Sequence, residues 1–317
     1  MIITVTPNPT IDKYLQIDRL QPGHAHQVRT THRDPGGKGV NVSRVLTRLG
    51  VQTLATGFAG DYRGELLKIF LNREGVANHF VPIKEVTRLN LYVMESDGTE
   101  TVFKEPSPHV EAEHWLRLVS VLDHYFDQAR FVVVAGSLPV GVSNQQLLDL
   151  LEHLRLRGVS VVLDARGGEL KAGVGARPFL IKPNRFEAEE LLGHPIADNR
   201  DELAQAAQRL RTLGPQSVLL SDGKAGAVLA NAQGTWWATP PTIEVASTIG
   251  AGDSMVAGFL TALLEGADGT QALRLATAAG AATARAAGTE LGQGAEIRAL
   301  QEQVVVESMP QIWIPPV

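Results

Sequence analysis

Two glycine-rich turns, widely separated in the chain, each lead into a run that is typical of a helix. The later turn covers residues 247–254 (STIGAGDS), and the apolar run after it predicts a helix that begins at the turn. The first turn of a helix has unpaired backbone N–H groups and partial positive charge, so it favours an anion. Gly250 and Gly252 lack a Cβ and let the backbone approach a phosphate closely. The turn therefore predicts an anion site.

A carboxylate, Asp253, stands within this same turn. It fits two interpretations, a side chain that caps the helix N-terminus or a general base beside the bound anion. A general base must lie within hydrogen-bond reach of the proton that it removes, and the anion site would bring a reacting group to that distance. The residues of the turn alone leave both interpretations open.

The earlier turn covers residues 34–46 (DPGGKGVNVSRVL) and opens an amphipathic helix that is ended by Gly50. It does not match the P-loop, because no glycine stands five residues before the Gly-Lys pair and Gly39 follows Lys38 where Ser or Thr is required. It does not match the dinucleotide pattern G-x-G-x-x-G either. Lys38 and Asn41 in the first helical turn favour a polar ligand over a purely structural turn.

Further polar residues follow directly after predicted strands. Asn8 and Asp12 come after the strand Ile2–Thr6, and Ser137 comes after the strand Phe131–Ala135. In open α/β sheets, ligands bind beyond the carboxyl ends of the strands, so these side chains are placed where a substrate could lie. For Asp12 the alternative is a carboxylate that stabilises a turn.

Asn184 and Glu187 stand three residues apart at the start of a predicted helix that follows the strand Phe179–Ile181. Both side chains could face one hydrated cation or phosphate. The alternative is a capping box, in which the two residues satisfy each other's backbone N–H groups. A further glycine-rich turn, Ser221–Ala227, follows the next strand.

Strands and helices are predicted to alternate through most of the chain. In order they are strand Ile2–Thr6, a helix ending at Leu49, strand Gln52–Gly57, helix Gly64–Arg73, strand Ala77–Val81, helix Glu111–Phe126, strand Phe131–Ala135, helix Ser143–Arg157, strands Ser160–Leu163 and Phe179–Ile181, helix Arg200–Leu213, strands Ser217–Ser221 and Val228–Ala230, and helices Gly252–Leu264 and Thr270–Arg285. This alternation predicts an α/β fold with a doubly wound, mostly parallel sheet flanked by helices, in one domain over residues 1–317. The tail Met309–Val317 carries no residue of predicted chemistry.

Two segments do not fit the alternation. Residues 14–33 are polar with apolar residues at alternating positions, and residues 87–94 and 100–104 predict a hairpin around the turn 96–99. Together they predict a small β-sheet lid formed by about residues 12–33 and 87–106. Arg88 would give this lid positive charge.

Composition excludes several classes of protein. The 317 residues are 44% hydrophobic with a net charge of −5, and no long basic run suggests a nucleic-acid or membrane-surface protein. There is no cysteine, so disulfides and thiolate chemistry are excluded. No signal-peptide pattern or membrane-spanning run is seen, and we expect a cytoplasmic protein. His24 and His26 form a close pair, but no further ligand nearby favours a metal site.

The motifs resemble those of the ribokinase-like (PfkB) carbohydrate kinases, and the resemblance extends from Thr4 to about Gly288. Residues 36–43 (GGKGVNVS) and the turn 247–254 carry it. The start 4–12 (TVTPNPTID) and residues 87–90 (TRLN) are similar to the 1-phosphofructokinases and the tagatose-6-phosphate kinases. The resemblance implies transfer of a phosphoryl group from MgATP to a sugar phosphate, with fructose 1-phosphate as the expected substrate and fructose 1,6-bisphosphate as the product.

The resemblance also implies roles for individual residues. Asp253 would be the general base, and Gly250, Ala251 and Gly252 would form the anion hole. Substrate would be bound by Asp12, Gly37, Lys38, Asn41, Arg88 and Ser137, with the phosphate of the sugar near Lys38 and Arg88. ATP would lie along Lys182, Asn184, Ser221, Gly223, Gly226, Thr248 and Gly252, and Asn184 and Glu187 would hold Mg²⁺ through water. Members of the family are commonly dimers through the lid, which implies a homodimer here.

Three alternatives remain open at this stage. The first is a tagatose-6-phosphate or fructose-6-phosphate kinase on the same scaffold. The second is a catalytically silent sugar-phosphate sensor, although a sensor has no need of Asp253 as a base. A dinucleotide-dependent oxidoreductase is disfavoured, because no G-x-G-x-x-G follows the first strand.

Overall fold

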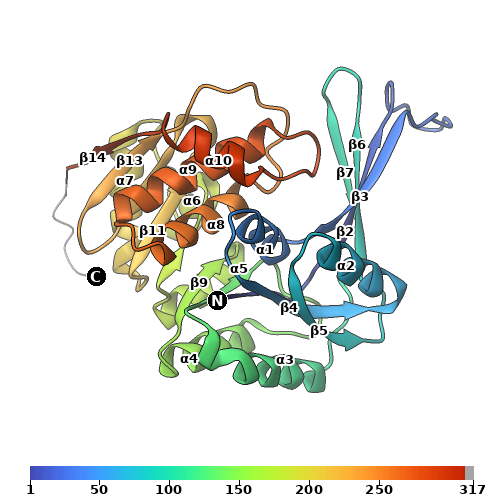
Figure 1. Ribbon diagram of the computed structural model, residues 1–317, viewed down its shortest axis with the longest axis horizontal. Coiled ribbons are helices and arrows are strands. Elements are labelled where there is room, and N and C mark those ends of the chain that lie inside the picture. Colours follow the sequence, from blue (N-terminus) through green and yellow to red (C-terminus); the bar gives the residue numbers. More distant parts are fainter. Residues whose placement is uncertain (311–317) are drawn as a thin grey trace.

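The computed structural model describes residues 1–310, and residues 311–317, the end of the tail noted above, lie outside the described part. A main sheet of ten strands forms the centre of the molecule (Figure 1). Across the sheet the order is β14 (Val305–Ser308), β13 (Thr235–Thr239), β12 (Ala227–Ala230), β11 (Ser217–Ser221), β10 (Leu180–Ile181), β9 (Ser160–Asp164), β8 (Phe131–Ala135), β1 (Ile2–Thr6), β4 (Thr53–Gly60) and β5 (Ala77–Ile83).

The strands from β11 to β5 pair in parallel, and the three pairings from β11 to β14 are antiparallel. From β1 the chain first builds β4 and β5 on one side and then returns to build β8 to β11 on the other. The order of strands therefore reverses between β1 and β8, the kind of switch point at which open α/β sheets bind ligands. The prediction of a mostly parallel, doubly wound sheet is confirmed.

Helices cover both faces of the main sheet. One face packs against α3 (Ala112–Tyr125), α4 (Asn144–Leu156), α5 (Gly167–Gly173), α6 (Arg185–Leu192) and α7 (Arg200–Thr212). The other packs against α1 (Lys38–Arg48), α2 (Asp61–Arg73), α8 (Ala251–Leu264), α9 (Gly269–Arg285) and α10 (Gly294–Gln301). Consecutive residues of a strand serve opposite faces, as Ile3 packs in the first core and Ile2 in the second. Burial of both faces explains why these strands are continuous apolar runs.

A second sheet of four strands stands apart from the main sheet (Figure 1). Its order is β3 (Thr30–Gly36), β2 (Thr10–Gln16), β6 (Arg88–Met94) and β7 (Glu100–Lys104). The pair β2 and β6 is parallel, and the two outer pairs are antiparallel. The first residues of β2 and β6, Thr10 and Arg88, are partners in register, so the base of this small sheet lies where the chain leaves β1.

Some elements carry no clear signal in the sequence. The glycine-rich α5, the helix α10 and the edge strand β14 were not predicted. Three short 3-10 turns, at Phe126–Gln128, Val174–Ala176 and Gly223–Ala225, complete the described elements. Among residues 1–310, no helix is both long and apolar enough to cross a membrane.

Candidate active site

One cavity of about 1060 Å³ lies at the carboxyl ends of the parallel strands, around the switch point between β1 and β8. All of the residues predicted above to bind substrate, ATP or magnesium, or to act in catalysis, line this cavity. The cavity is bounded by the loops after β1, β8, β9, β10 and β11, by the N-termini of α1 and α8, and by the base of the small sheet. The geometry therefore brings together motifs from the whole length of the chain.

Helix α8 begins at the later glycine-rich turn. Gly250 is its N-cap with φ of 73°, a left-handed conformation in which a non-glycine residue is strained. The amide of Ala251 donates to Thr248 O over 3.3 Å, whereas the amides of Gly252 and Asp253 lie in the first turn, where an α-helix provides no carbonyl partner for them. Gly250 and not Asp253 is the N-cap, and within residues 1–310 the hydrogen bond that the Asp253 carboxylate accepts comes from Asn41. The capping interpretation of Asp253 is therefore not supported, and the anion-binding geometry is present.

The N-terminus of α1 meets that of α8 inside the cavity. Asn41 Nδ2 donates to Asp253 Oδ2 over 2.8 Å, and both side chains are buried. Lys38 Nζ lies 2.7 Å from Asp164 Oδ1 and 3.9 Å from Glu187 Oε1. An ammonium group and three carboxylates are thus gathered where the two helices meet.

The proximity of these charged groups shifts the pKa values of Asp253 and Lys38. Burial and, next, the charge of Asp164 raise the pKa of Asp253 to about 6, against the opposing effects of Lys38, Asn41 and Lys182. For Lys38, burial lowers the pKa, but Asp164, Asp253 and Glu187 outweigh it and the net shift is upward. Lys38 is therefore positive at neutral pH, and Asp253 is a carboxylate whose basicity is enhanced.

A second polar cluster lies beneath the small sheet. Asp12 accepts a hydrogen bond from Asn90 Nδ2 over 2.8 Å, and burial raises the pKa of Asp12 to about 6, against the opposing effects of Asn90 and Arg88. Arg88 donates to the backbone oxygen of Asn8 at 3.1 Å and contacts Asn90 Oδ1 at 3.3 Å. Asn8 Nδ2 donates to Ser107 Oγ at 2.6 Å and to Ser137 Oγ at 3.2 Å.

The remaining wall of the cavity carries the motifs assigned to the nucleotide. Lys182 is 4% exposed, and its Nζ would lie 3.0 Å from a Cβ added at Gly252, so the ammonium rests against the anion turn. Asn184 and Glu187 form the capping box that was one of their two interpretations. Glu187 Oε2 accepts from the Asn184 backbone, which leaves Oε1 to face Lys38. The turn Ser221–Ala227 and Thr248 line the same wall.

The sequence prediction missed Asp164. This residue ends β9, is fully buried, and its Oδ2 has no hydrogen-bond partner among the described residues. Its neighbour in register is Ala135 at the end of β8, so Asp164 lies at the same edge of the sheet as Asn8 and Ser137, directly before Ala165, which lines the cavity. The sequence does contain a signal for Asp164, because it is an acidic residue at the end of the apolar strand β9.

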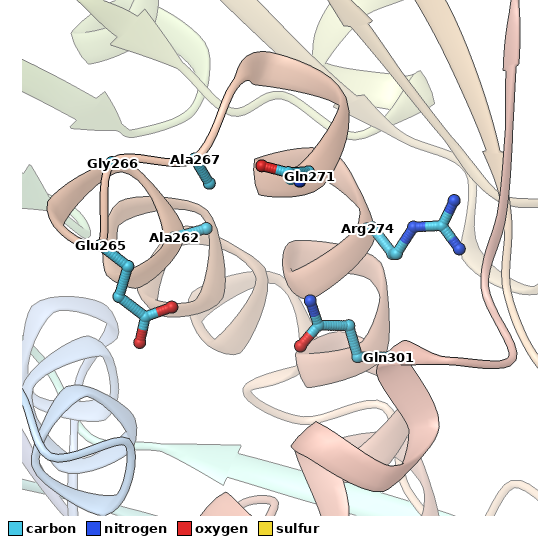
Figure 2. A pocket seen from close by; sticks show the side chains of 7 residues that line it. All are labelled: Ala262, Glu265, Gly266, Ala267, Gln271, Arg274 and Gln301. Atoms are coloured by element: carbon cyan, nitrogen blue, oxygen red, sulfur yellow. The ribbon is translucent and has the colours of Figure 1, made fainter.

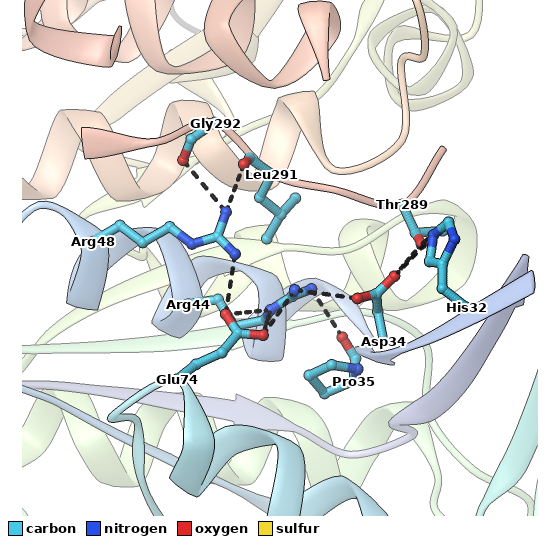
Figure 3. A network of polar contacts seen from close by, with 9 residues as sticks. All are labelled: His32, Asp34, Pro35, Arg44, Arg48, Glu74, Thr289, Leu291 and Gly292. Carbon is cyan, nitrogen blue, oxygen red and sulfur yellow. Dashed lines mark hydrogen bonds and ion pairs between the residues drawn. The ribbon is translucent and has the colours of Figure 1, made fainter. Parts of the chain in front are cut away.

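A network of ion pairs fixes α1 behind the site (Figure 3). Arg44 Nε donates to both carboxylate oxygens of Glu74, at 2.9 and 3.0 Å, and Arg44 also contacts Asp34 at the end of β3. Arg48 donates to the backbone oxygen of Leu291 and pairs with Glu74 at 3.1 Å. Because Arg44 is 3% exposed, it is itself buried, and it holds the half-buried carboxylates of Glu74 and Asp34 together. The network joins α1, α2, the small sheet and the segment after α9.

A second cavity, of about 400 Å³, lies between the ends of α8, α9 and α10 (Figure 2). Its charged side chains are engaged in contacts already, since Glu265 pairs with Arg298 and Arg274 donates to the backbone oxygen of Val304. The other polar side chains that line it are the amides of Gln271 and Gln301. This cavity therefore carries no group suited to catalysis.

Comparison with known proteins gives a consistent result. The family model described as pfkB family carbohydrate kinase matches residues 6–294. The chain is 36% identical to the 1-phosphofructokinase of Escherichia coli (strain K12) over 280 residues, which is 88% of this chain and 89% of that protein. It is 32% identical to the 1-phosphofructokinase of Bacillus subtilis over 314 residues, 99% of each chain. Among solved structures, phosphofructokinase-2 from Escherichia coli in complex with substrates and products has a TM-score of 0.91 at 29% identity, covering 95% of this chain and 98% of that one.

Proposed function

This chain belongs to the pfkB family of carbohydrate kinases, and from that membership we propose that it transfers the γ-phosphoryl group of ATP to a hydroxyl of fructose 1-phosphate, giving fructose 1,6-bisphosphate and ADP. Relatives of 31–37% identity carry the name 1-phosphofructokinase, which supports this substrate. The observation that carries the proposal is the buried Asp253 carboxylate at the N-terminus of α8, hydrogen-bonded by Asn41.

In this mechanism Asp253 takes the proton of the attacking hydroxyl, whose oxygen then forms a bond to the γ-phosphorus as the bond from phosphorus to the leaving oxygen of ADP breaks. Its pKa of about 6 suits that role, because the carboxylate is ionised at neutral pH yet more basic than an exposed one. The amides of Gly252 and Asp253, which have no carbonyl partner in the first turn, and the weakly bonded amide of Ala251 lie where negative charge on the migrating group would be stabilised. Lys182 adds positive charge beside Gly252.

The residues present fit a magnesium ion. Glu187 lines the cavity and Asp164 lies directly behind it, and Asp164 Oδ2 has no hydrogen-bond partner within residues 1–310. Mg²⁺ prefers carboxylate oxygens such as Glu187 Oε1 and Asp164 Oδ2 while keeping several waters. We propose that Asn184 and Glu187, together with Asp164, hold the hydrated ion. When bound, the ion would neutralise charge on the phosphates of ATP. Lys38 then neutralises the carboxylates that face the site.

The sugar would lie between Asp253 and the cluster beneath the small sheet. Asp12 and Asn41 are placed to hold its hydroxyls, and Arg88 and Ser137 to hold its existing phosphate. Closure of the small sheet over the cavity would exclude water, which would otherwise accept the phosphoryl group. The lid limits of about residues 12–33 and 87–106, a homodimer through the lid, and a cytoplasmic location remain predictions.

The experiment that tests this function measures ADP release from MgATP with fructose 1-phosphate, fructose 6-phosphate, tagatose 6-phosphate, fructose and ribose in parallel. We expect the highest kcat/KM with fructose 1-phosphate. A higher kcat/KM with tagatose 6-phosphate or fructose 6-phosphate would identify that sugar as the substrate, and the proposed phosphoryl transfer would stand. Absence of turnover with every sugar, combined with tight binding of one of them, would favour the sensor.

A further inference from the structure

Arg166 lines the cavity and was not assigned a role by any motif. It lies two residues beyond Asp164, at the N-cap of α5, and its side chain is exposed. Within the part of the chain that the structure describes, its guanidinium makes no hydrogen bond or ion pair, whereas Arg185 pairs with Asp222 and Arg44 with Glu74. An exposed, unpaired arginine that lines a cavity needs an explanation.

The topology places Arg166 beside the sugar end of the cavity. The adjacent strands β1, β8 and β9 end at this edge, and the loops that follow them carry Asn8, Ser137 and Arg166. The loops after β8 and β9 are joined, because Gly136 N donates to Asp164 O over 3.0 Å and Leu138 N to Glu169 Oε1 over 3.3 Å. The position of Arg166 relative to Ser137 is therefore set by hydrogen bonds between the two loops.

Arg88 completes the cluster from the small sheet. Its Nε is buried and has no hydrogen-bond partner among residues 1–310, and its other nitrogens contact uncharged oxygens of Asn8 and Asn90. Burial lowers the pKa of Arg88, and the charge of Arg166 lowers it further, while Asp12 and Tyr92 raise it. Both arginines therefore line one cavity close enough for their charges to interact, and within residues 1–310 neither guanidinium forms an ion pair with a carboxylate.

The hydroxyl groups of two serines near Arg88 can each donate a hydrogen bond. Ser107 Oγ and Ser137 Oγ both accept hydrogen bonds from Asn8 Nδ2, at 2.6 and 3.2 Å. A hydroxyl that accepts in this way keeps its own hydrogen for another acceptor. Ser137 lines the cavity together with the two arginines, whereas Ser107 lies behind Asn8. Two guanidinium groups without a carboxylate partner within residues 1–310 and a hydroxyl that is free to donate are suited to a dianionic phosphate.

We propose that Arg166 and Arg88 form a clamp for the phosphate that the sugar already carries, and that Arg166 is a specificity-determining residue for phosphorylated over unphosphorylated sugars. The inference rests on the proposed function and deepens it, because the clamp would hold the phosphate of the sugar that takes no part in the transfer. Lys38, by contrast, is already engaged with Asp164. Discrimination follows because an unphosphorylated sugar would leave the donors of Arg88 and Arg166 without the anion that they bind.

The test compares Arg166→Ala, Arg166→Lys and Arg155→Ala with the wild type. Arg155 is a matched control, because it is also exposed and its side chain has no partner within residues 1–310, but it lies in the last turn of α4, near the amino end of β9 and away from the cavity. For Arg166→Ala we expect KM for fructose 1-phosphate to rise about 10- to 100-fold, the loss typical of a removed charge-assisted hydrogen bond, with KM for ATP within about twofold. For Arg166→Lys, KM for fructose 1-phosphate should lie between the values of the wild type and Arg166→Ala, because lysine keeps the positive charge and loses the planar guanidinium. Arg155→Ala should match the wild type.

A titration that needs no turnover separates failure of the clamp from failure of the function. Inorganic phosphate is titrated calorimetrically into each variant with a non-hydrolysable ATP analogue bound, so that the anion turn is filled. Weaker phosphate binding in Arg166→Ala than in Arg155→Ala supports the clamp even if no sugar phosphate is turned over. If the wild type is active but Arg166→Ala matches Arg155→Ala in KM for the sugar phosphate, the clamp is wrong and the function stands. If the wild type is inactive and phosphate binding is equal in both variants, both proposals fail.

Discussion

Asn41 donates a hydrogen bond of 2.8 Å to Asp253, a residue 212 positions away in the sequence. The bond joins the N-terminal turns of α1 and α8, the two glycine-rich motifs of the chain, at the bottom of one cavity. Asn41 has an amide that can hold the Asp253 carboxylate in place while that carboxylate takes a proton. The contact therefore links the part of the site that binds substrate to the part that performs the chemistry.

Replacement of the base tests the chemistry most directly. Asp253→Asn keeps the shape of the side chain and its contact with Asn41, so ATP and sugar phosphate should bind with nearly unchanged affinity. It removes the proton acceptor, and kcat should fall by about 10²- to 10⁴-fold, the usual contribution of a positioned base. Steady-state ADP release gives kcat, and calorimetric titration of each substrate gives the affinities. Turnover equal to that of the wild type would remove Asp253 from this role.

The pH dependence of the reaction should report the Asp253 carboxylate. With its pKa raised to about 6, the base is protonated below that pH, so kcat/KM should fall as the pH drops through 6. The hydrogen bond from Asn41 stabilises the charged form, and Asn41→Ala should therefore move the acidic limb to higher pH. The substrate phosphates and Asp12 also titrate near pH 6 and contribute to the pH dependence of kcat/KM. Their contributions should be the same in Asn41→Ala and the wild type, so a difference between the two profiles reports Asp253. Identical acidic limbs in the two proteins would contradict the assignment.

The glycine-rich turns and the carboxyl ends of the strands were readable because they depend on local sequence. A short apolar run followed by a polar residue identified Asn8 and Ser137, and glycine followed by an amphipathic run located the N-termini of α1 and α8. These signals placed residues at one edge of a sheet, and that edge is where the cavity lies.

Pairings over long sequence separations could not be predicted. The ion pair of Lys38 with Asp164 spans 126 residues and depends on the register of β8 with β9, which one sequence does not contain. The unpaired Arg166 was missed for the same reason, since its significance depends on which partners are absent around it. Helix α5 was missed because its glycines disfavour a helix locally, and packing on β9 and α4 outweighs that preference.

Asp12 should destabilise the folded protein at neutral pH. Its pKa is raised from 3.8 to about 6 by burial, so the folded state binds the proton more tightly than the unfolded state does, and the ionised form is penalised by about 3 kcal/mol. The free energy of unfolding from this group is therefore highest below pH 4 and falls as pH rises through 6. Asp12→Asn removes the penalty and should raise the free energy of unfolding at pH 7.5, with a gain that shrinks toward pH 4. Urea unfolding at both pH values measures it, and an equal gain at both would show that burial of charge is not the cause.

Gly250 should be required for the shape of the anion turn. Its φ of 73° is strained for any other residue, and a Cβ there would lie 2.5 Å from Leu291 Cδ2, inside van der Waals contact. Gly250→Ala should therefore lower stability by about 1–3 kcal/mol and also displace the amides of Ala251 and Gly252, lowering kcat by at least about 10²-fold.

The residue just beyond the other end of the same helix provides the matched control for Gly250. Gly266 follows α8 with φ of 84°, and a Cβ added there would meet no atom within 4 Å. Gly266→Ala introduces the same backbone strain without a clash and away from the cavity, so it should lower stability by about 1–2 kcal/mol and leave kcat unchanged. Thermal unfolding and ADP release of both variants separate the two effects. If Gly250→Ala and Gly266→Ala both lose stability and both retain the wild-type kcat, the conformation of Gly250 is needed only for folding. The amides of α8 would then not stabilise the migrating phosphoryl group.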